Sequence, residues 1–290
     1  MRDHKTMMNL IIDVAKQDKR IRAVALNGSR VDPCAKKDRF QDYDITYYVD
    51  DFNAFPKDTK WIDVFGKRIA MQTRDDQLFI PDDTNDPNWY IYLMLFEDGT
   101  RIDLSIVGID RMEADAYHGD GFFRLLLDKD SRLKNVPPIH DHAFHVKKPD
   151  ESLYDAAVTE CLWLIPSVGK GIERQEYPYA MEMLKLVRDT LRAMCNWAIG
   201  IEYDFKINVG MFSKRFKTLL KKEWHEAYLK TYPLATRESV YQAINVLLFT
   251  FKEVATYVAS ELNYTYDDKT HENVSNYIQT LEKQGYYSKA

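Results

Sequence analysis

The spacing of apolar residues changes along the chain and divides it into two parts. In the first part, short apolar runs of strand length alternate with polar loops, at residues 21–27, 43–49, 68–72, 89–96 and 101–107. In the second part, apolar residues recur at helical spacing over 179–199 and 237–262, and a shorter helical pattern covers 271–284. A charged stretch around Pro149 separates the two parts.

These patterns predict an α+β fold. A mixed β-sheet flanked by helices should occupy residues 1–149, because an amphipathic helical pattern within residues 1–19 precedes the first strand. The pair Asp98-Gly99 between two apolar runs predicts a hairpin in this sheet. A bundle of amphipathic helices should follow as a second domain, residues 150–290.

Composition and charge exclude several classes of protein. The formal net charge of −5 disfavours nonspecific nucleic-acid binding, because such binding neutralises phosphates with Lys and Arg. No apolar run reaches the roughly 20 residues that a membrane span requires. Cys34, Cys161 and Cys195 are widely spaced, which favours reduced thiols over a disulfide framework. We therefore expect a cytoplasmic protein without a nucleic-acid or membrane partner.

Two aspartates next to the second apolar run carry candidate chemistry. Asp42 and Asp44 are separated by one residue, so on a strand both side chains leave the same face. Two carboxylates this close repel each other unless a cation lies between them. Magnesium takes oxygen ligands and commonly binds substrate phosphates as well. The pair therefore indicates half of a metal and nucleotide site.

A third carboxylate is expected from a neighbouring strand. Asp103 is set among apolar residues, where a lone carboxylate is costly unless it is paired or bound to metal. The three aspartates would hold two metal ions that align an attacking oxygen with a phosphoryl group. The simpler alternatives are that Asp42 and Asp44 lie in a solvated loop and that Asp103 faces water at a sheet edge.

The turn after the first predicted strand offers donors for an anion. Gly28 lets backbone N–H groups approach phosphate oxygens closely, and the hydroxyl of Ser29 adds a donor. Arg30 offers a fork of donors to the same anion. Taken alone, Gly-Ser after a strand is an ordinary turn. The turn and the three aspartates together, in this order and spacing, are far more specific than each part.

This arrangement resembles the polymerase-beta-like nucleotidyltransferase superfamily, whose signature is a strand, a Gly-Ser turn, an Asp-apolar-Asp motif and a later acidic residue among apolar residues. Within that superfamily the chain resembles the aminoglycoside 6-adenylyltransferases. The stretches that carry this resemblance include DKRIRAVALNGSR, FQDYDITYYV, YLMLFEDGTRIDLSI, GKGIER and MCNWAIGIE. They span most of the chain in the order of the family.

The resemblance implies a magnesium-dependent transfer of AMP from ATP to a hydroxyl of a cationic aminoglycoside, with pyrophosphate released and antibiotic resistance conferred. The 6-hydroxyl of streptomycin is the implied acceptor. Asp42, Asp44 and Asp103 would be catalytic and would bind two magnesium ions, and Gly28 and Ser29 would bind the triphosphate. Asp103 would also take the proton of the attacking hydroxyl.

The second domain, by the same resemblance, closes the nucleotide and substrate cleft as a helical domain of a monomeric enzyme. Lys170 and Lys214 match basic residues of the family and would neutralise phosphate there. The chain departs from the family pattern at Asn27, where Glu is often found, and at Met211, where the family has a second lysine. These departures affect acceptor specificity and phosphate contacts rather than the three aspartates.

Two alternatives stay open at this point. The first keeps the reaction but changes the acceptor to another aminoglycoside, a lincosamide or a protein side chain. The second is a nucleotide-binding module that keeps the fold without turnover. Three mutually repelling carboxylates argue against the second alternative, because a protein that only binds nucleotide has little use for them.

Overall fold

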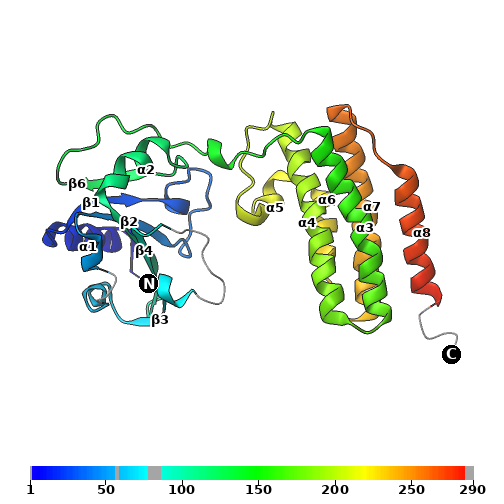
Figure 1. Cartoon of the computed structure of the whole chain (residues 1–290), viewed down its shortest axis with the longest axis horizontal. Helices are drawn as coiled ribbons and strands as arrows, with labels where there is room; N and C mark the ends of the chain where they lie inside the picture. The colour runs from blue at the N-terminus through cyan, green and yellow to red at the C-terminus, as the bar shows by residue number, and fades with distance from the viewer. Residues whose placement is uncertain (1, 56–58, 78–85, 285–290) are drawn as a thin grey trace. The chain divides into compact units, whose positions relative to one another are not determined.

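The computed structural model describes residues 2–55, 59–77 and 86–284, and the chain forms two compact units, Met1–Ala143 and Phe144–Ala290 (Figure 1). In its described part, the first unit contains a six-stranded sheet with the order β3-β4-β5-β2-β1-β6. The strands are β1 (Ile21–Leu26), β2 (Tyr43–Val49), β3 (Arg68–Thr73), β4 (Trp89–Phe96), β5 (Arg101–Gly108) and β6 (Arg124–Asp128).

The sheet is mixed, as the sequence predicts. Strands β2 and β5 run parallel, whereas β1 pairs antiparallel with both β2 and β6. Strands β4 and β5 form the predicted hairpin, and Gly99 in its turn has a φ of +77°. The five predicted strands are confirmed to within two residues at each end, and β6 was not predicted.

Two helices cover opposite faces of this sheet (Figure 1). Helix α1 (His4–Gln17) buries Met7, Ile11 and Ala15, which recur every four residues, against the face that carries Tyr47. Helix α2 (Met112–His118) covers the face that carries Tyr48. Because side chains alternate along a strand, these two tyrosines mark which residues of β2 point to which side.

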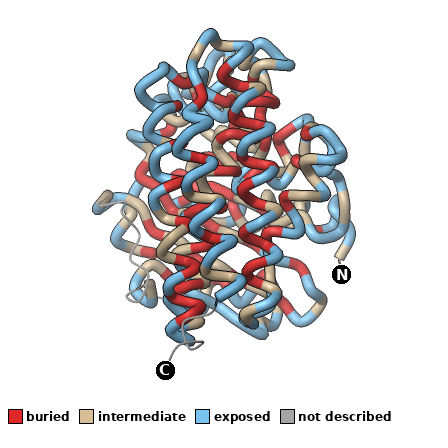
Figure 2. Tube along the Cα trace, turned by 90° about the vertical axis from the view of Figure 1, so that its right-hand side faces the viewer, coloured by how far each residue is buried: buried red, intermediate tan, exposed pale blue. Residues whose placement is uncertain are grey.

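The second unit is helical, as predicted. Its helices are α3 (Glu151–Glu173), α4 (Tyr177–Glu202), α5 (Phe216–Leu219), α6 (Lys222–Lys230), α7 (Arg237–Leu262) and α8 (Asp268–Gln284). Buried positions recur along the long helices while the positions between them are exposed (Figure 2). Helix α4 packs against both α3 and α7. The predicted patterns at 179–199, 237–262 and 271–284 correspond to α4, α7 and α8, and α3 was not delimited from the sequence.

A buried carboxylate in this unit has local partners. Glu173, at the end of α3, is 6% exposed and accepts hydrogen bonds from Arg237 Nε at 2.9 Å and Tyr241 Oη at 2.7 Å, both on α7. A buried charge is stable only when it is paired and hydrogen-bonded, so this group has a structural role.

In the part of the chain that the structure describes, none of these helices is both long and apolar enough to span a bilayer.

Candidate active site

The three predicted aspartates come from neighbouring strands on one face of the sheet. Asp44 on β2 lies directly opposite Asp103 on β5 in the parallel register. Asp42 lies one residue before β2, so it shares the face of Asp44, which is also the face of Tyr48. All three residues are half-buried. The structure thus brings together the carboxylates that lie about sixty positions apart in the sequence.

The Gly-Ser turn packs directly onto Asp44. Strand β1 ends at Leu26, and the backbone N–H of Asn27 donates to the carbonyl of Asp44 at 2.8 Å. Gly28 has a φ of +62°, and a Cβ atom at this position would lie 2.0 Å from Asp44 Oδ2. No side chain fits there, so glycine is required both by the backbone conformation and by the close approach of the carboxylate.

Burial and mutual repulsion raise the pKa values of two of the three carboxyl groups. Desolvation, followed by the charges of Asp103 and Asp42, raises the pKa of Asp44 to about 6, although the backbone N–H of Ser29 donates to its carboxylate. Desolvation is also the main cause that raises the pKa of Asp42, against the opposing charge of Arg101. A cation that approached these groups would therefore be bound favourably.

A guanidinium group already contacts two of the three aspartates. Arg101 begins β5, and its Nε and Nη2 atoms donate to Asp103 Oδ1 and Oδ2 at 2.7 and 2.8 Å. The Nε atom also lies 3.7 Å from Asp42 Oδ2. Asp44 has no ion-pair partner in the described residues. Arg101 was not predicted from the sequence, although its position two residues before Asp103 places both side chains on one face of the strand.

The donor set suits a hard divalent cation, although the described residues contain no group of three acidic, histidine or cysteine side chains spaced to hold a metal ion. All three candidate ligands are carboxylates, which magnesium prefers. Asp44 is the member without a cation, and Gly28 leaves its carboxylate close to backbone N–H groups. Asp103 is instead engaged by Arg101 through both oxygens.

Arg30 has backbone partners within the site. Its Nε donates to the carbonyl of Asp42 at 2.9 Å and its Nη2 to the carbonyl of Gln41 at 2.7 Å. The guanidinium also stacks on the ring of Tyr43, with 3.7 Å between Cζ and the ring centroid. These contacts fix the chain immediately before β2, and they use donors that the sequence analysis assigned to a phosphate.

A cavity of about 260 Å³ opens beside Asp42, within the first unit. Its wall carries charges of both signs, together with His4 and the exposed ring of Phe40: the arginines are Arg2, Arg30, Arg39 and Arg101, and the aspartates are Asp3, Asp38 and Asp42. The Arg2 group is paired with Asp98 at 2.9 Å. Arg2 and Arg39 were not singled out from the sequence: Arg2 lies far from the motif, and Arg39, although only three residues before Asp42, matches no known spacing.

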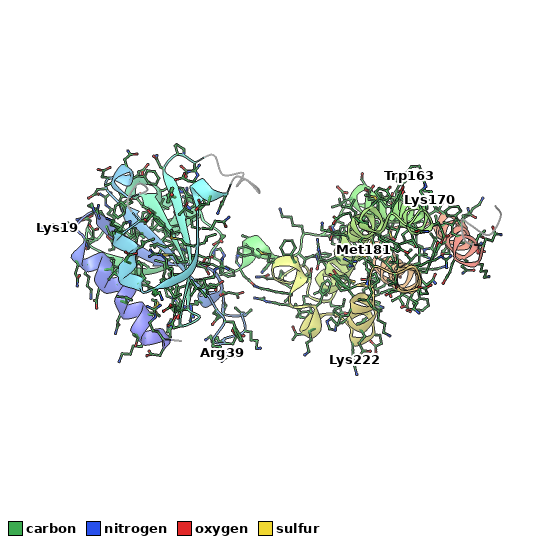
Figure 3. All side chains as sticks on the ribbon, turned by 90° about the horizontal axis from the view of Figure 1, so that it is seen from below. Lys19, Arg39, Trp163, Lys170, Met181 and Lys222 are labelled. Atoms are coloured by element: carbon green, nitrogen blue, oxygen red, sulfur yellow. The ribbon has the colours of Figure 1, made fainter. Side chains whose placement is uncertain are left out.

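The two predicted lysines lie far apart within the second unit. Lys170 is exposed on α3, on the same helix as Trp163 (Figure 3), and its neighbour Gly171 packs against Ala180 near the start of α4. Lys214 follows Ser213, whose hydroxyl donates to Asn196 Oδ1 at 2.8 Å near the other end of α4. Sixteen residues of helix, from 180 to 196, separate these contacts by about 24 Å.

Comparisons with known proteins show the family of the chain. A family model described as streptomycin adenylyltransferase matches residues 1–281. An aminoglycoside 6-adenylyltransferase of Campylobacter jejuni is 34% identical over 96% of this chain and 95% of its own length. One of Bacillus subtilis is 34% identical over 92% of this chain and 94% of its own length. A crystal structure of an aminoglycoside 6-adenyltransferase from Bacillus subtilis, 30% identical, aligns over 97% of this chain and 99% of that chain with a TM-score of 0.46. The chain is therefore an adenylyltransferase and belongs to the streptomycin adenylyltransferase family.

Proposed function

We propose that the enzyme transfers AMP from ATP to a hydroxyl of an aminoglycoside, with the 6-hydroxyl of streptomycin as the favoured acceptor, and so confers resistance. The observation that carries the proposal is the register of Asp44 with Asp103. The carboxylate of Asp44 occupies the space that a side chain at Gly28 would need. The names of the family and of the relatives support the acceptor class.

The chain's own residues account for each part of the reaction. The backbone N–H of Gly28 and the hydroxyl of Ser29 bind the triphosphate, and Asp103 accepts the proton of the attacking hydroxyl. The hydroxyl oxygen forms a bond to the α-phosphorus while the bond from that phosphorus to the bridging oxygen breaks, and pyrophosphate leaves. Arg30 fixes the backbone at Asp42, so the carboxylate next to β2 keeps its position during the reaction.

Magnesium is the cation that these carboxylates would hold. Asp42, Asp44 and Asp103 are the proposed ligands, and two ions, when bound, would neutralise the phosphates and lower the energy of the charge that develops during transfer. The cost of bringing three carboxylates together is then offset by the cation they bind. We also propose that the enzyme is cytoplasmic and monomeric, and light scattering of the purified protein checks the oligomeric state.

Mass spectrometry of the acceptor tests the proposal. The purified enzyme with ATP, magnesium and streptomycin should add one AMP to streptomycin, and leaving out any one component should stop the reaction. An unmodified streptomycin in the presence of an active enzyme would overturn the acceptor assignment. A panel of other aminoglycosides, a lincosamide and a protein acceptor, assayed with labelled ATP, then identifies the acceptor.

A further inference from the structure

Arg101 is placed so that its guanidinium competes for the carboxylates proposed to hold metal. Both of its bonds go to the two oxygens of Asp103, and its Nε atom is 3.7 Å from Asp42, which is contributed by the neighbouring strand segment. The side chain of Asp103 is only 18% exposed, so the guanidinium covers much of the carboxylate that water or an ion would otherwise reach. One cation thus bridges two of the three aspartates.

We propose that Arg101 is an internal counter-ion that occupies the carboxylate cluster when no metal is bound, and that it weakens metal binding because the metal must displace it. The inference rests on the proposed metal-binding role of the three aspartates. A bidentate guanidinium engages both oxygens of a carboxylate, so Asp103 cannot turn the same oxygens towards a divalent ion without losing part of this pair.

The charge of Arg101 acts in the same direction as its geometry. With the guanidinium present, three carboxylates and one cation leave the cluster with a charge of about −2, and without it the charge is about −3 when all three are ionised. A more negative cluster attracts a divalent ion more strongly. The benefit to the free enzyme is that two half-buried carboxylates are not left to repel each other.

An opposite role for Arg101 predicts the opposite result. If the guanidinium only held Asp103 in the orientation that the metal requires, its removal would loosen that ligand and weaken metal binding. The two roles therefore differ in the sign of the change in metal affinity. The measurement needs no turnover, because it can be made on the enzyme without nucleotide or acceptor.

Titration with Mn²⁺, followed by electron paramagnetic resonance of the free ion, shows whether loss of Arg101 raises or lowers the metal affinity. Removing a partly exposed charge pair is worth about 1 kcal/mol, so Arg101→Gln should bind Mn²⁺ about fivefold more tightly than the wild type. Arg101→Lys keeps the charge but loses the fork, and should lie between them. An affinity of Arg101→Gln equal to or below that of the wild type would overturn the inference.

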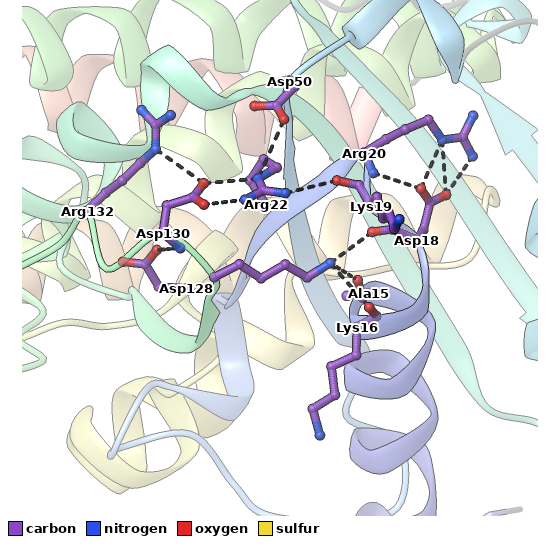
Figure 4. A network of polar contacts seen from close by, with 11 residues as sticks. Ala15, Lys16, Asp18, Lys19, Arg20, Arg22, Asp50, Asp128, Asp130 and Arg132 are labelled. Carbon is purple, nitrogen blue, oxygen red and sulfur yellow. Dashed lines mark hydrogen bonds and ion pairs between the residues drawn. The ribbon is translucent and has the colours of Figure 1, made fainter.

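The control variants separate this inference from the proposed function. Arg22→Gln removes another partly exposed Arg–Asp pair of the same unit, in which Arg22 contacts Asp130 and Asp50 away from the cluster (Figure 4). Its Mn²⁺ affinity should equal that of the wild type. Asp44→Asn should lose Mn²⁺ binding. If the wild type binds Mn²⁺ and Asp44→Asn does not, the metal site is supported. An Arg101→Gln variant that then binds Mn²⁺ no more tightly than the wild type overturns only the role of Arg101. If neither the wild type nor Arg101→Gln binds Mn²⁺, the metal site and this inference both fail.

Discussion

Asp44 and Asp103 face each other across the parallel pair of β2 and β5, but only Asp103 has a guanidinium partner within hydrogen-bonding distance. Desolvation, and then the charge of Asp103, raises the pKa of Asp44 to about 6. The ionised form of Asp44 is therefore a cost to the metal-free fold. The same carboxylate is central to the proposed reaction, so function and stability make opposite demands on one residue.

Replacing Asp44 with Asn should stabilise the metal-free enzyme while abolishing AMP transfer. A pKa of about 6 in place of 3.8 corresponds to about 3 kcal/mol of stability lost at pH values above 6, an upper limit for the gain. Because the folded-state pKa is raised, this loss should disappear as the pH falls from 6 towards 3.8. Urea unfolding of the metal-free wild type and Asp44→Asn at pH 8 and pH 4 measures the gain in stability at high pH and its disappearance at low pH, and an assay of AMP transfer measures the loss of activity.

Asp103→Asn is the matched variant for this prediction. It removes a carboxylate that Arg101 already neutralises, so it should not stabilise the protein, and it should also lose transfer. The explanation would be wrong if Asp44→Asn unfolded at a lower urea concentration than the wild type at pH 8, or if both variants were stabilised equally.

Gly28→Ala should remove activity and destabilise the protein. The new Cβ would meet Asp44 Oδ2 at 2.0 Å, at a φ of +62° that L-residues rarely adopt. Strain of this kind costs about 1–3 kcal/mol, and the shifted carboxylate should reduce kcat at least about 100-fold. Gly66→Ala is the control, because its φ is +118° but its new Cβ would lie 3.4 Å from Arg2, and the atoms nearest to it belong to Arg2 and Phe96 rather than to Asp42, Asp44 or Asp103. That variant should lose stability and retain transfer; equal loss of activity in both would contradict the assignment.

The sequence predicts the strands and faces that carry the three aspartates, but not the partners of individual side chains. Alternation along a strand is enough to place Asp42 and Asp44 on one face, and the apolar run around Asp103 is enough to predict its strand. The pairing of β2 with β5, which brings Asp44 and Asp103 together, depends on contacts between segments about sixty residues apart. That register is consistent with the three-carboxylate site but is not encoded in either segment alone.

Two arginines show where prediction from spacing ends. Arg30 follows the Gly-Ser turn and offers donors to a phosphate, yet its donors bind the carbonyls before β2, because the chain returns to that point after residue 40. Arg101 has no motif, yet the fold places it on Asp103. Long cationic side chains reach several alternative partners at similar energy, and only the packed structure selects among them.

Arg30→Gln distinguishes anchoring of the backbone from phosphate binding. The structure predicts that kcat falls about tenfold, because the backbone at Asp42 loses two charge-assisted hydrogen bonds, while the KM for ATP stays within about twofold. Steady-state kinetics with varied ATP provide the measurement. A large rise in the KM for ATP with an unchanged kcat would show instead that Arg30 binds the triphosphate.

The helical unit should lose stability in mild acid through His271. This residue is 7% exposed and shares a hydrogen bond of 2.7 Å with Tyr266 Oη. Desolvation, and then the charge of Lys252, lowers its pKa, against the opposing charge of Asp268. Because the folded-state pKa lies below 6.5, this contribution to stability is complete above pH 6.5 and is lost as the pH falls through the folded-state pKa. The thermal midpoint should therefore fall less for His271→Gln than for the wild type between pH 7.5 and 5.5; equal decreases would contradict this role.

At most one of the two lysines in the helical unit should act on the nucleotide. About 24 Å of α4 separates the contacts beside Lys170 and Lys214, which is more than one triphosphate spans. Among the variants Lys170→Ala and Lys214→Ala, only one should raise the KM for ATP by more than about threefold. The other should behave like Lys222→Ala, which removes an exposed lysine of the same unit that pairs only weakly, at 3.9 Å, with Glu226. Increases in both variants, with the double variant showing the product of the two, would mean that both lysines contact ATP and that this unit changes its internal arrangement when ATP binds.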